Sequence, residues 1–461
     1  YFEAVALALS GEYQEALDVM QTAETELEKQ SARDITLYTP LVNLGFAEVY
    51  VQQAIATRNN STLGQAQQRL KDGIELNPRL ARAQLLLAES YSLQGEYASA
   101  IKSLDDAMAL PELANDMTLI LGKGQIYLTE GSSLMRQGSQ SNGIAQLEKA
   151  DYQAFYALYI NPYEETAHQL RIQSALERNL PGLAVLYCQT YLLYYPDSPA
   201  ALRLLGDARQ AEENTDLALQ AYSQALNSGE DSPLLVDPLL SRAQFYQQRR
   251  RYDLALVDYS RALKIQPDQT VQVQRMLAAY AAGDLDTAQS DSEALMGSGV
   301  VSDDQLRFIQ ARIIMDQAPD NARSVYQSAL DLLGQIQDSA LTPDDAAIAN
   351  QYRASANFKL DNLDAARQNI DTALSLGETG TRHYLSGQIY EAQGNLTAAA
   401  HDYEWIETWN PIYSFAFMDD VTARLTDIRQ QLADAVEATS AAVEATATAE
   451  AAGTPTEEPT P

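Results

Sequence analysis

Small and aromatic residues recur along the chain at fixed distances. In the clearest stretch Ala88 is followed by Tyr91, by a turn signal at Gly95 and by a second small residue at Ala100. Residues three or four apart share one face of a helix, so this stretch predicts a helix, a break and a second helix. Twelve positions separate the small residue from the later alanine here, and the same spacing recurs in three other pairs: Gly206 and Ala218, Ala243 and Ala255, Gly387 and Ala399.

Each predicted helix pair also carries signals for its turn and its end. Glycine at the turn tolerates the positive φ that breaks the first helix, as at Gly95 and Gly394. On the second helix, alanine lets the two backbones approach, and an aromatic residue or leucine four positions later fills the space beside it. An Asn-Pro step such as Asn77-Pro78 ends the second helix, because the residue before proline avoids the helical conformation. The pattern therefore predicts a chain of short helical hairpins.

This pattern resembles the tetratricopeptide repeat, a helix–turn–helix unit of about 34 residues. The resemblance covers residues 1–411 and implies about eleven units in an all-α, right-handed superhelical solenoid of stacked antiparallel helix pairs. The hairpins at 41–78 and 117–162 are longer than the family unit, which leaves their local path open. Residues 412–434 have the spacing of a capping helix. Residues 435–461, rich in Ala, Thr, Glu and Pro, predict a disordered tail.

The charge balance excludes some classes of binding partner. Lys and Arg number 31 against 63 Asp and Glu, a net charge of −32, so binding to nucleic acid or to an anionic membrane surface is not expected. No stretch is apolar for long enough to span a membrane, so this segment is not expected to insert directly into one. The chain starts at Tyr1 inside an amphipathic pattern, so we expect a missing preceding segment, an export signal or an anchor. Localisation stays open, with an extracytoplasmic or membrane-anchored place favoured over a cytoplasmic one.

The sequence offers little catalytic chemistry. It has no HExxH, P-loop or G-x-S-x-G motif and no Cys/His cluster, so neither an enzyme nor a cofactor or metal site is expected. Cys188 occupies a position that is tyrosine in sister units, which favours a buried, inert thiol. His168 and His383 are predicted to pack on first helices, and His401 to be solvated.

The remaining candidate site is a groove. In the family that the chain resembles, the outward stripe of each first helix lines a concave surface that holds an extended segment of a partner protein. One subtype of the family binds the C-terminal carboxylate of a peptide with a set of Lys, Asn and Arg side chains. No such set occurs here, so this groove is not expected to recognise a peptide C-terminus. The predicted partner-binding residues are Arg82, Leu85, Glu89, Gln169, Gln173, Arg203, Asp207, Leu240, Gln244, Gln247, Tyr384, Gln388 and Glu391.

These features favour a protein–protein interaction scaffold or adaptor. The alternative is the regulatory or sensor repeat array of a larger enzyme or transcription factor whose N-terminal part is missing here. An anchored envelope or secreted protein is a further possibility. Partner identity, pathway and oligomeric state are left open by the sequence.

Overall fold

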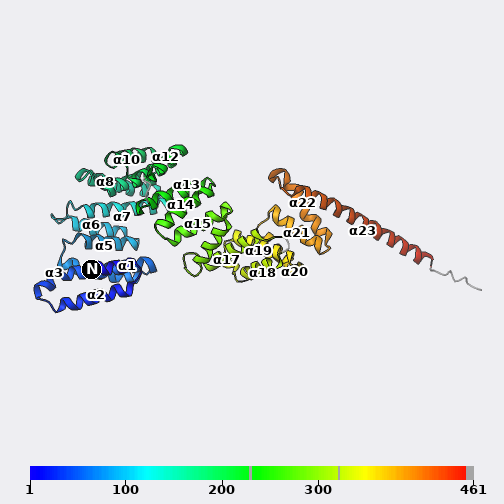
Figure 1. Ribbon diagram of the computed structural model, residues 1–461, viewed down its shortest axis with the longest axis horizontal. Helices are drawn as coiled ribbons and strands as arrows, with labels where there is room; N and C mark the ends of the chain where they lie inside the picture. Colours follow the sequence, from blue (N-terminus) through cyan, green and yellow to red (C-terminus); the bar gives the residue numbers. More distant parts are fainter. Residues whose placement is uncertain (228–230, 320–321, 453–461) are drawn as a thin grey trace, which may run out of the picture. The chain divides into compact units, whose positions relative to one another are not determined.

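The computed structural model describes residues 1–227, 231–319 and 322–452. Within these ranges the regular secondary structure is helical, without a strand, and the chain divides into two compact units, Tyr1–Arg242 and Ala243–Pro461 (Figure 1). The all-α class and the stacked helix pairs expected from the sequence are confirmed.

Among its described residues, the first unit contains six hairpins that follow one another in chain order, and then the start of α13 (Val236–Gln248) (Figure 1). Their helices are α1 (Phe2–Leu9) and α2 (Tyr13–Glu28), α3 (Ala32–Thr57) and α4 (Asn60–Leu76), α5 (Ala81–Leu93) and α6 (Tyr97–Met108), α7 (Met117–Arg136) and α8 (Gln140–Ile160), α9 (Glu165–Glu177) and α10 (Pro181–Tyr194), and α11 (Pro199–Ala211) and α12 (Thr215–Ala225). First helices also contact the next first helix, from α3 through α5, α7 and α9 to α11. They therefore form one continuous surface in this unit.

The second unit contains the remaining hairpins and a terminal helix. Its helices are the end of α13 (Val236–Gln248) with α14 (Tyr252–Ile265), α15 (Gln269–Ala282) with α16 (Leu285–Leu295), α17 (Asp303–Gln317) with α18 (Arg323–Gly334), α19 (Pro343–Lys359) with α20 (Leu363–Leu376), α21 (Gly380–Ala392) with α22 (Leu396–Tyr413), and α23 (Met418–Ala452). In the described residues α1–α22 thus make eleven pairs, as the repeat pattern predicted.

The small residues of the repeat lie where the two helices of a pair meet. Ala100, Ala255 and Ala399 are fully buried, as expected for the closest joints. A Cβ added to Gly206 would overlap the ring of Tyr222 from the partner helix. The small residue of the first helix and the aromatic residue of the second are therefore complementary in shape, which explains why their spacing recurs along the chain.

The long hairpins predicted from the sequence are present. The helix α3 has 26 residues, and α7 and α8 have 20 and 21. The start of α3 lies earlier than residue 41, because Ser31 caps the helix by accepting a hydrogen bond from the Asp34 amide. Pro40 is accommodated inside α3.

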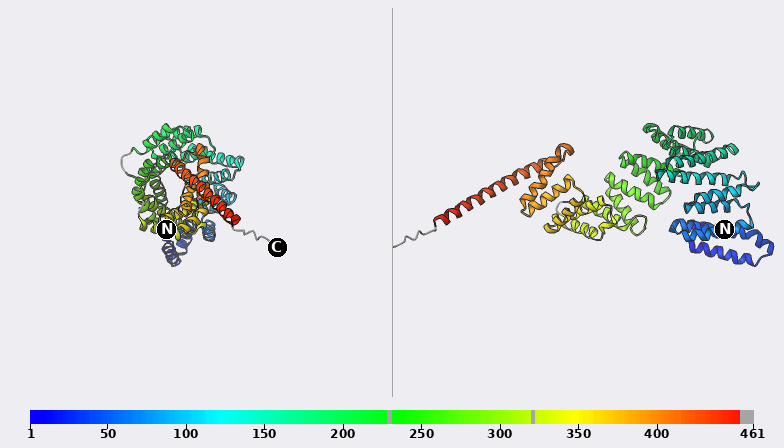
Figure 2. Two further views of the ribbon diagram at one scale, coloured as in Figure 1. Left: turned by 90° about the vertical axis from the view of Figure 1, so that its right-hand side faces the viewer. Right: turned by 180° about the vertical axis from the view of Figure 1, so that it is seen from behind.

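The C-terminal boundaries differ from the prediction. The helix α22 continues through Pro411 to Tyr413 and ends at Ser414, which adopts the left-handed conformation with φ 52°. The capping helix α23 begins at Met418 and continues past residue 434 to Ala452, extending away from α22 (Figure 2). Alanine and glutamate favour helix, although every side chain described after Leu432 is exposed. The rest of the predicted tail, residues 453–461, lies outside the described residues.

Candidate protein-binding groove

A groove follows three consecutive first helices of the first unit, α3, α5 and α7. It encloses a cavity of about 320 Å³. Its lining residues are Val51, Gln52, Ile55, Arg82, Leu86, Glu89, Ser92, Leu93, Gly122, Gln125, Ile126 and Thr129. We call this set the α3–α5–α7 groove.

The groove exists because these helices present matching stripes. On α5, residues 82, 86, 89 and 93 recur at steps of three or four and so share one face. The neighbouring helix α7 comes close because Gly122 has no side chain, and a Cβ there would overlap Leu85 of α5. Gly122 therefore sets the distance between the two walls.

The floor and the rim differ in polarity. The floor is apolar, since Val51, Leu86 and Ile126 are buried. Two large apolar side chains remain open to solvent at the rim, Ile55 at 52% and Leu93 at 49% exposure. An exposed apolar rim over an apolar floor can accept an apolar side chain of a partner.

One wall carries a charged network. The guanidinium of Arg82 donates to both carboxylate oxygens of Glu48, at 2.8 and 3.1 Å, and to Glu89 at 3.3 Å. Burial opposes the charge of Arg82, but the hydrogen bond and charge of Glu48 raise its pKa overall. Burial raises the pKa of Glu89 against the opposing effect of Arg82. Arg82 thus holds Glu48 inside the fold while it lines the groove.

The groove contains two of the three α5 residues predicted from the sequence. Arg82 and Glu89 line it. Leu85 does not line the groove as expected: its side chain is 7% exposed and packs in the core against Gly122. Its neighbour Leu86 takes the expected place at the groove floor. Continuing the stripe from Arg82 by steps of four, three and four, through Leu86 and Glu89 to Leu93, would have identified the leucines that line this groove.

The predicted groove residues on later helices of the first unit are partly buried or bonded to other side chains of the chain. Gln169 and Gln173 on α9 and Leu240 on α13 are half-buried. Arg203 and Asp207 form an ion pair of 2.7 Å on α11, and Asp207 also accepts a hydrogen bond of 2.7 Å from Tyr222. Burial raises the pKa of Asp207. This stripe is therefore polar, with its charges partly satisfied within the chain.

Three predicted glutamines lie in the second unit. Gln244 is exposed and Gln388 is half-buried. Gln247 accepts a hydrogen bond of 2.9 Å from the hydroxyl of Tyr259. That bond uses the amide oxygen, so the Gln247 nitrogen keeps its two donors for another acceptor.

Tyr384 and Glu391 were predicted to line a groove for a partner, but they contact other residues of this chain. Tyr384 stacks on Phe417 at 4.6 Å and donates to Asp420 at 2.7 Å. Glu391 accepts from Arg424 of α23 at 2.9 Å. The capping helix thus engages both side chains, and in the last hairpin it takes the place that the sequence assigned to a partner.

The cysteine and two of the three histidines, which were considered as catalytic candidates, are buried in the fold. Cys188 is fully buried, and burial raises the pKa of its thiol to about 12. His168 stacks on Tyr191 at 4.9 Å and lies 3.0 Å from the Pro162 carbonyl, while His383 lies 2.8 Å from Asp402. In the part of the chain that the structure describes, no group of three or more His, Cys, Asp and Glu side chains is placed to hold a metal ion.

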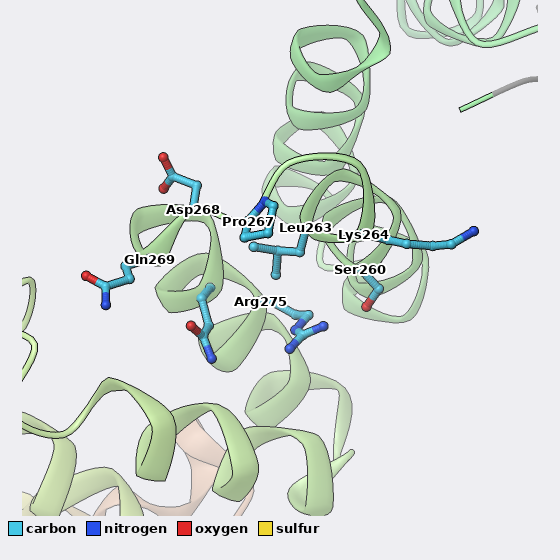
Figure 3. A pocket seen from close by; sticks show the side chains of 8 residues that line it. Ser260, Leu263, Lys264, Pro267, Asp268, Gln269 and Arg275 are labelled. Atoms are coloured by element: carbon cyan, nitrogen blue, oxygen red, sulfur yellow. The ribbon is translucent and has the colours of Figure 1, made fainter. Parts of the chain in front are cut away.

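A second cavity, of about 420 Å³, lies between α14 and α15 (Figure 3). Arg275 points toward it, but the guanidinium is bound by the carboxylate of Asp291 at 2.6 and 2.8 Å. Because Asp291 is buried and neutralises this charge, Arg275 stabilises the hairpin and is not available to hold an anionic ligand.

Comparison with solved structures identifies distant likenesses. No protein family and no curated protein matches the chain. Solved structures that are similar include TTC0263, a thermophilic TPR protein of Thermus thermophilus, with 17% identity over 44% of this chain and 97% of that one and a TM-score of 0.33. PilF of Pseudomonas aeruginosa has 17% identity over 50% and 96%, with a TM-score of 0.32. YrrB, a TPR protein with an unusual peptide-binding site, has 19% identity over 46% and 97%, with a TM-score of 0.29.

Proposed function

We propose that this chain of tetratricopeptide-type hairpins is a protein-interaction scaffold that binds an extended segment of a partner in the α3–α5–α7 groove. The observation that carries the proposal is the groove itself: three adjacent first helices combine an apolar floor with an exposed apolar rim and a polar wall. A concave site of this composition suits one apolar side chain flanked by hydrogen-bonding backbone.

The polar groups of the groove suit a peptide backbone. Gln52 and Gln125 carry amides that both donate and accept, so they can pair with a backbone N–H or C=O whatever the partner's side chain. Each such bond contributes only about 0.5–1.5 kcal/mol net. Useful affinity therefore needs several contacts along one segment, which a row of adjacent helices provides.

Glutamines elsewhere extend the same chemistry. Tyr259 fixes the orientation of the Gln247 amide, so that the outward group is a donor. A pre-oriented donor loses less rotational freedom on binding than a mobile one. This supports a backbone-reading role for first-helix glutamines beyond the groove.

The regulatory or sensor array of a larger protein stays an alternative hypothesis, since the same groove would serve it. An extracytoplasmic or membrane-anchored place also stays a hypothesis. Among the described helices, none has the length and apolar character needed to cross a membrane.

The test removes the two exposed anchors of the rim. The double variant Ile55→Ser/Leu93→Ser and the parent chain are used to capture proteins from native lysate, and the captured proteins are quantified by mass spectrometry. We expect the set bound by the parent to fall at least tenfold with the double variant, because the rim side chains cover the apolar floor.

Matched controls separate binding from folding. Leu76→Ser removes an equally exposed leucine, 51% exposed at the end of α4 and outside the groove, and should leave capture unchanged. Circular dichroism should give the same helicity for all three chains. An equal loss of capture with Leu76→Ser, or full capture by the double variant, would refute the groove assignment.

A further inference from the structure

Four aromatic side chains form a closed circuit at the end of the last hairpin. The ring centroids of Trp405 and Trp409 are 5.9 Å apart, and those of Trp409 and Tyr413 6.1 Å. Tyr413 lies 5.9 Å from Phe415, and Phe415 closes the circuit 6.5 Å from Trp405. These rings line a cavity of about 460 Å³ together with Glu378, Thr379 and Gly380. We call this set the aromatic cup.

The size of the circuit suits a cation. In a four-membered circuit of nearly equal sides, the central point is closer to each corner than the length of a side. The middle of the cup therefore lies within about 6 Å of every ring centroid, the range in which an aromatic face attracts a cation. Tyr413 is 61% and Trp409 38% exposed, so the cup opens to solvent.

The surrounding fold holds the rings in place. Asn410 accepts hydrogen bonds at its backbone oxygen from the Ser414 amide and at Oδ1 from the Phe415 amide, both of 2.8 Å, which fixes the turn after α22. Gly380 leaves room for Phe415, whose ring a Cβ at that position would overlap. Trp405 stacks on buried His383 at 4.2 Å, and His383 is held by Asp402. The cup is therefore preorganised by contacts within the chain.

A carboxylate stands at the mouth of the cup. The side chain of Glu378 is 63% exposed, and its Oε1 lies 3.9 Å from His383 Nε2. In the ranges that the structure describes, no lysine or arginine is ion-paired with Glu378. The neighbouring cation, Arg382, points its guanidinium at the Gly377 carbonyl, 2.6 Å away, and at Gln351. A bound cation would thus meet a negative charge that the fold leaves uncompensated.

We propose that the aromatic cup binds the cationic head of a lysine or arginine side chain presented by a partner protein. The four rings provide aromatic surface around the cavity, and Glu378 provides the counter-charge. The net charge of −32 favours encounter with a basic partner. The proposal rests on the scaffold function and adds the chemistry of a second contact point, in the other unit of the chain.

Intrinsic fluorescence provides a direct readout, because Trp405 and Trp409 are the two tryptophans of the chain and both line the cup. The probe is an acetylated tri-arginine amide, and its neutral isostere, an acetylated tri-citrulline amide, is the matched control. We expect tri-arginine to change the fluorescence saturably and tri-citrulline to leave it unchanged at equal concentration. An equal response to both would overturn the proposal, because an apolar pocket does not require charge.

Two variants locate the binding. Glu378→Gln should weaken tri-arginine binding about tenfold, whereas Glu28→Gln, which removes one exposed charge on α2, should leave it unchanged. Trp409→Leu should abolish binding measured by calorimetry, with helicity unchanged. Equal weakening by Glu378→Gln and Glu28→Gln would mean general charge attraction and would overturn the assignment.

Three further outcomes distinguish this proposal from another class of ligand and from the scaffold function. A response to tetramethylammonium without one to tri-arginine would show a receptor for a small quaternary ammonium and would overturn the side-chain assignment. Failure of the tri-arginine test with loss of capture in Ile55→Ser/Leu93→Ser would refute the cup alone. A positive tri-arginine test with unchanged capture would support the cup and refute the groove.

Discussion

The ring of Tyr403 lies against the backbone of Gly387, so closely that a Cβ on the glycine would come within 2.5 Å of the Tyr403 Cε1 atom. The tyrosine hydroxyl then reaches Glu391, one turn further along the same helix as the glycine, at 3.0 Å. The glycine provides the space for the ring, and the ring carries its hydroxyl to the outer edge of the hairpin.

This contact predicts the effect of adding one methyl group. Gly387→Ala should lower the free energy of unfolding by about 1–3 kcal/mol, because the ring must move within a packed joint. Gly64→Ala is the control: a Cβ there meets nothing within 4 Å, and alanine in α4 should stabilise the chain by about 0.5–1 kcal/mol. Urea unfolding measures the free energy of unfolding of both variants and of the parent chain. A stabilised Gly387→Ala would contradict the close contact.

Cys188 should be inert in the folded chain. It is fully buried, and its thiol pKa is raised to about 12, so thiolate is scarce at neutral pH. A thiol reagent should label less than a tenth of the native protein in the time that labels one thiol per chain in denaturant. Cys188→Ser should cost about 1–3 kcal/mol, because it buries a hydroxyl among apolar groups. Rapid labelling of the native chain would show that the thiol is accessible.

His168 should make stability depend on pH in the acid direction. Burial lowers the pKa of its imidazole below the ordinary 6.5; the charge of Arg171 acts the same way, and the Pro162 carbonyl, Glu164 and Glu165 oppose it. As the pH falls through 6.5, the unfolded chain takes up the proton first, so stability decreases until the folded pKa is passed.

The measurement compares unfolding free energies at pH 7.5 and pH 5.5. His168→Asn should lose less stability on acidification than the parent, since it no longer titrates, while His401→Asn, which changes an exposed histidine, should behave as the parent does. The same acid loss in all three chains would assign the effect to other groups.

The end of α23 should be dispensable for stability. Every described side chain beyond Leu432 is exposed, and the composition of residues 436–461 predicts a tail that buries no core. Their removal should shift Tm by less than about 2 °C, which corresponds to less than about 2 kcal/mol in a chain of this size. A much lower Tm would show that this segment docks on the repeats.

First-helix glutamines should contribute to capture with little dependence on salt. The variant Gln169→Ala/Gln173→Ala/Gln244→Ala/Gln247→Ala should weaken partner binding by about thirtyfold or more, because each of the four lost bonds removes about 0.5–1.5 kcal/mol. Pull-downs across a salt series check this. Capture by the parent that disappears at moderate salt would instead indicate the acidic outer surface and a basic partner.

The repeat positions of the sequence predicted most of the fold. The 12-residue spacing of small residues placed the hairpin joints at Ala100, Ala255 and Ala399, all fully buried. The spacing succeeds because close approach of two adjacent helices is a local requirement, set by residues within one hairpin. Cys188 was placed in the interior by the same reasoning.

The functional surfaces depended on contacts between hairpins. Helical periodicity predicted which side of α5 faces outward, but only the close approach of Gly122 decided that Leu85 is buried and that its neighbour Leu86 lines the groove. Periodicity did not reveal that α23 engages Tyr384 and Glu391. The aromatic cup likewise joins α22 and the turn after it to Glu378, before α21. The sequence alone determined the hairpins, because their helices pack within short range. The tertiary structure decided which outward side chains stay open, because that depends on how the next hairpin lies against them.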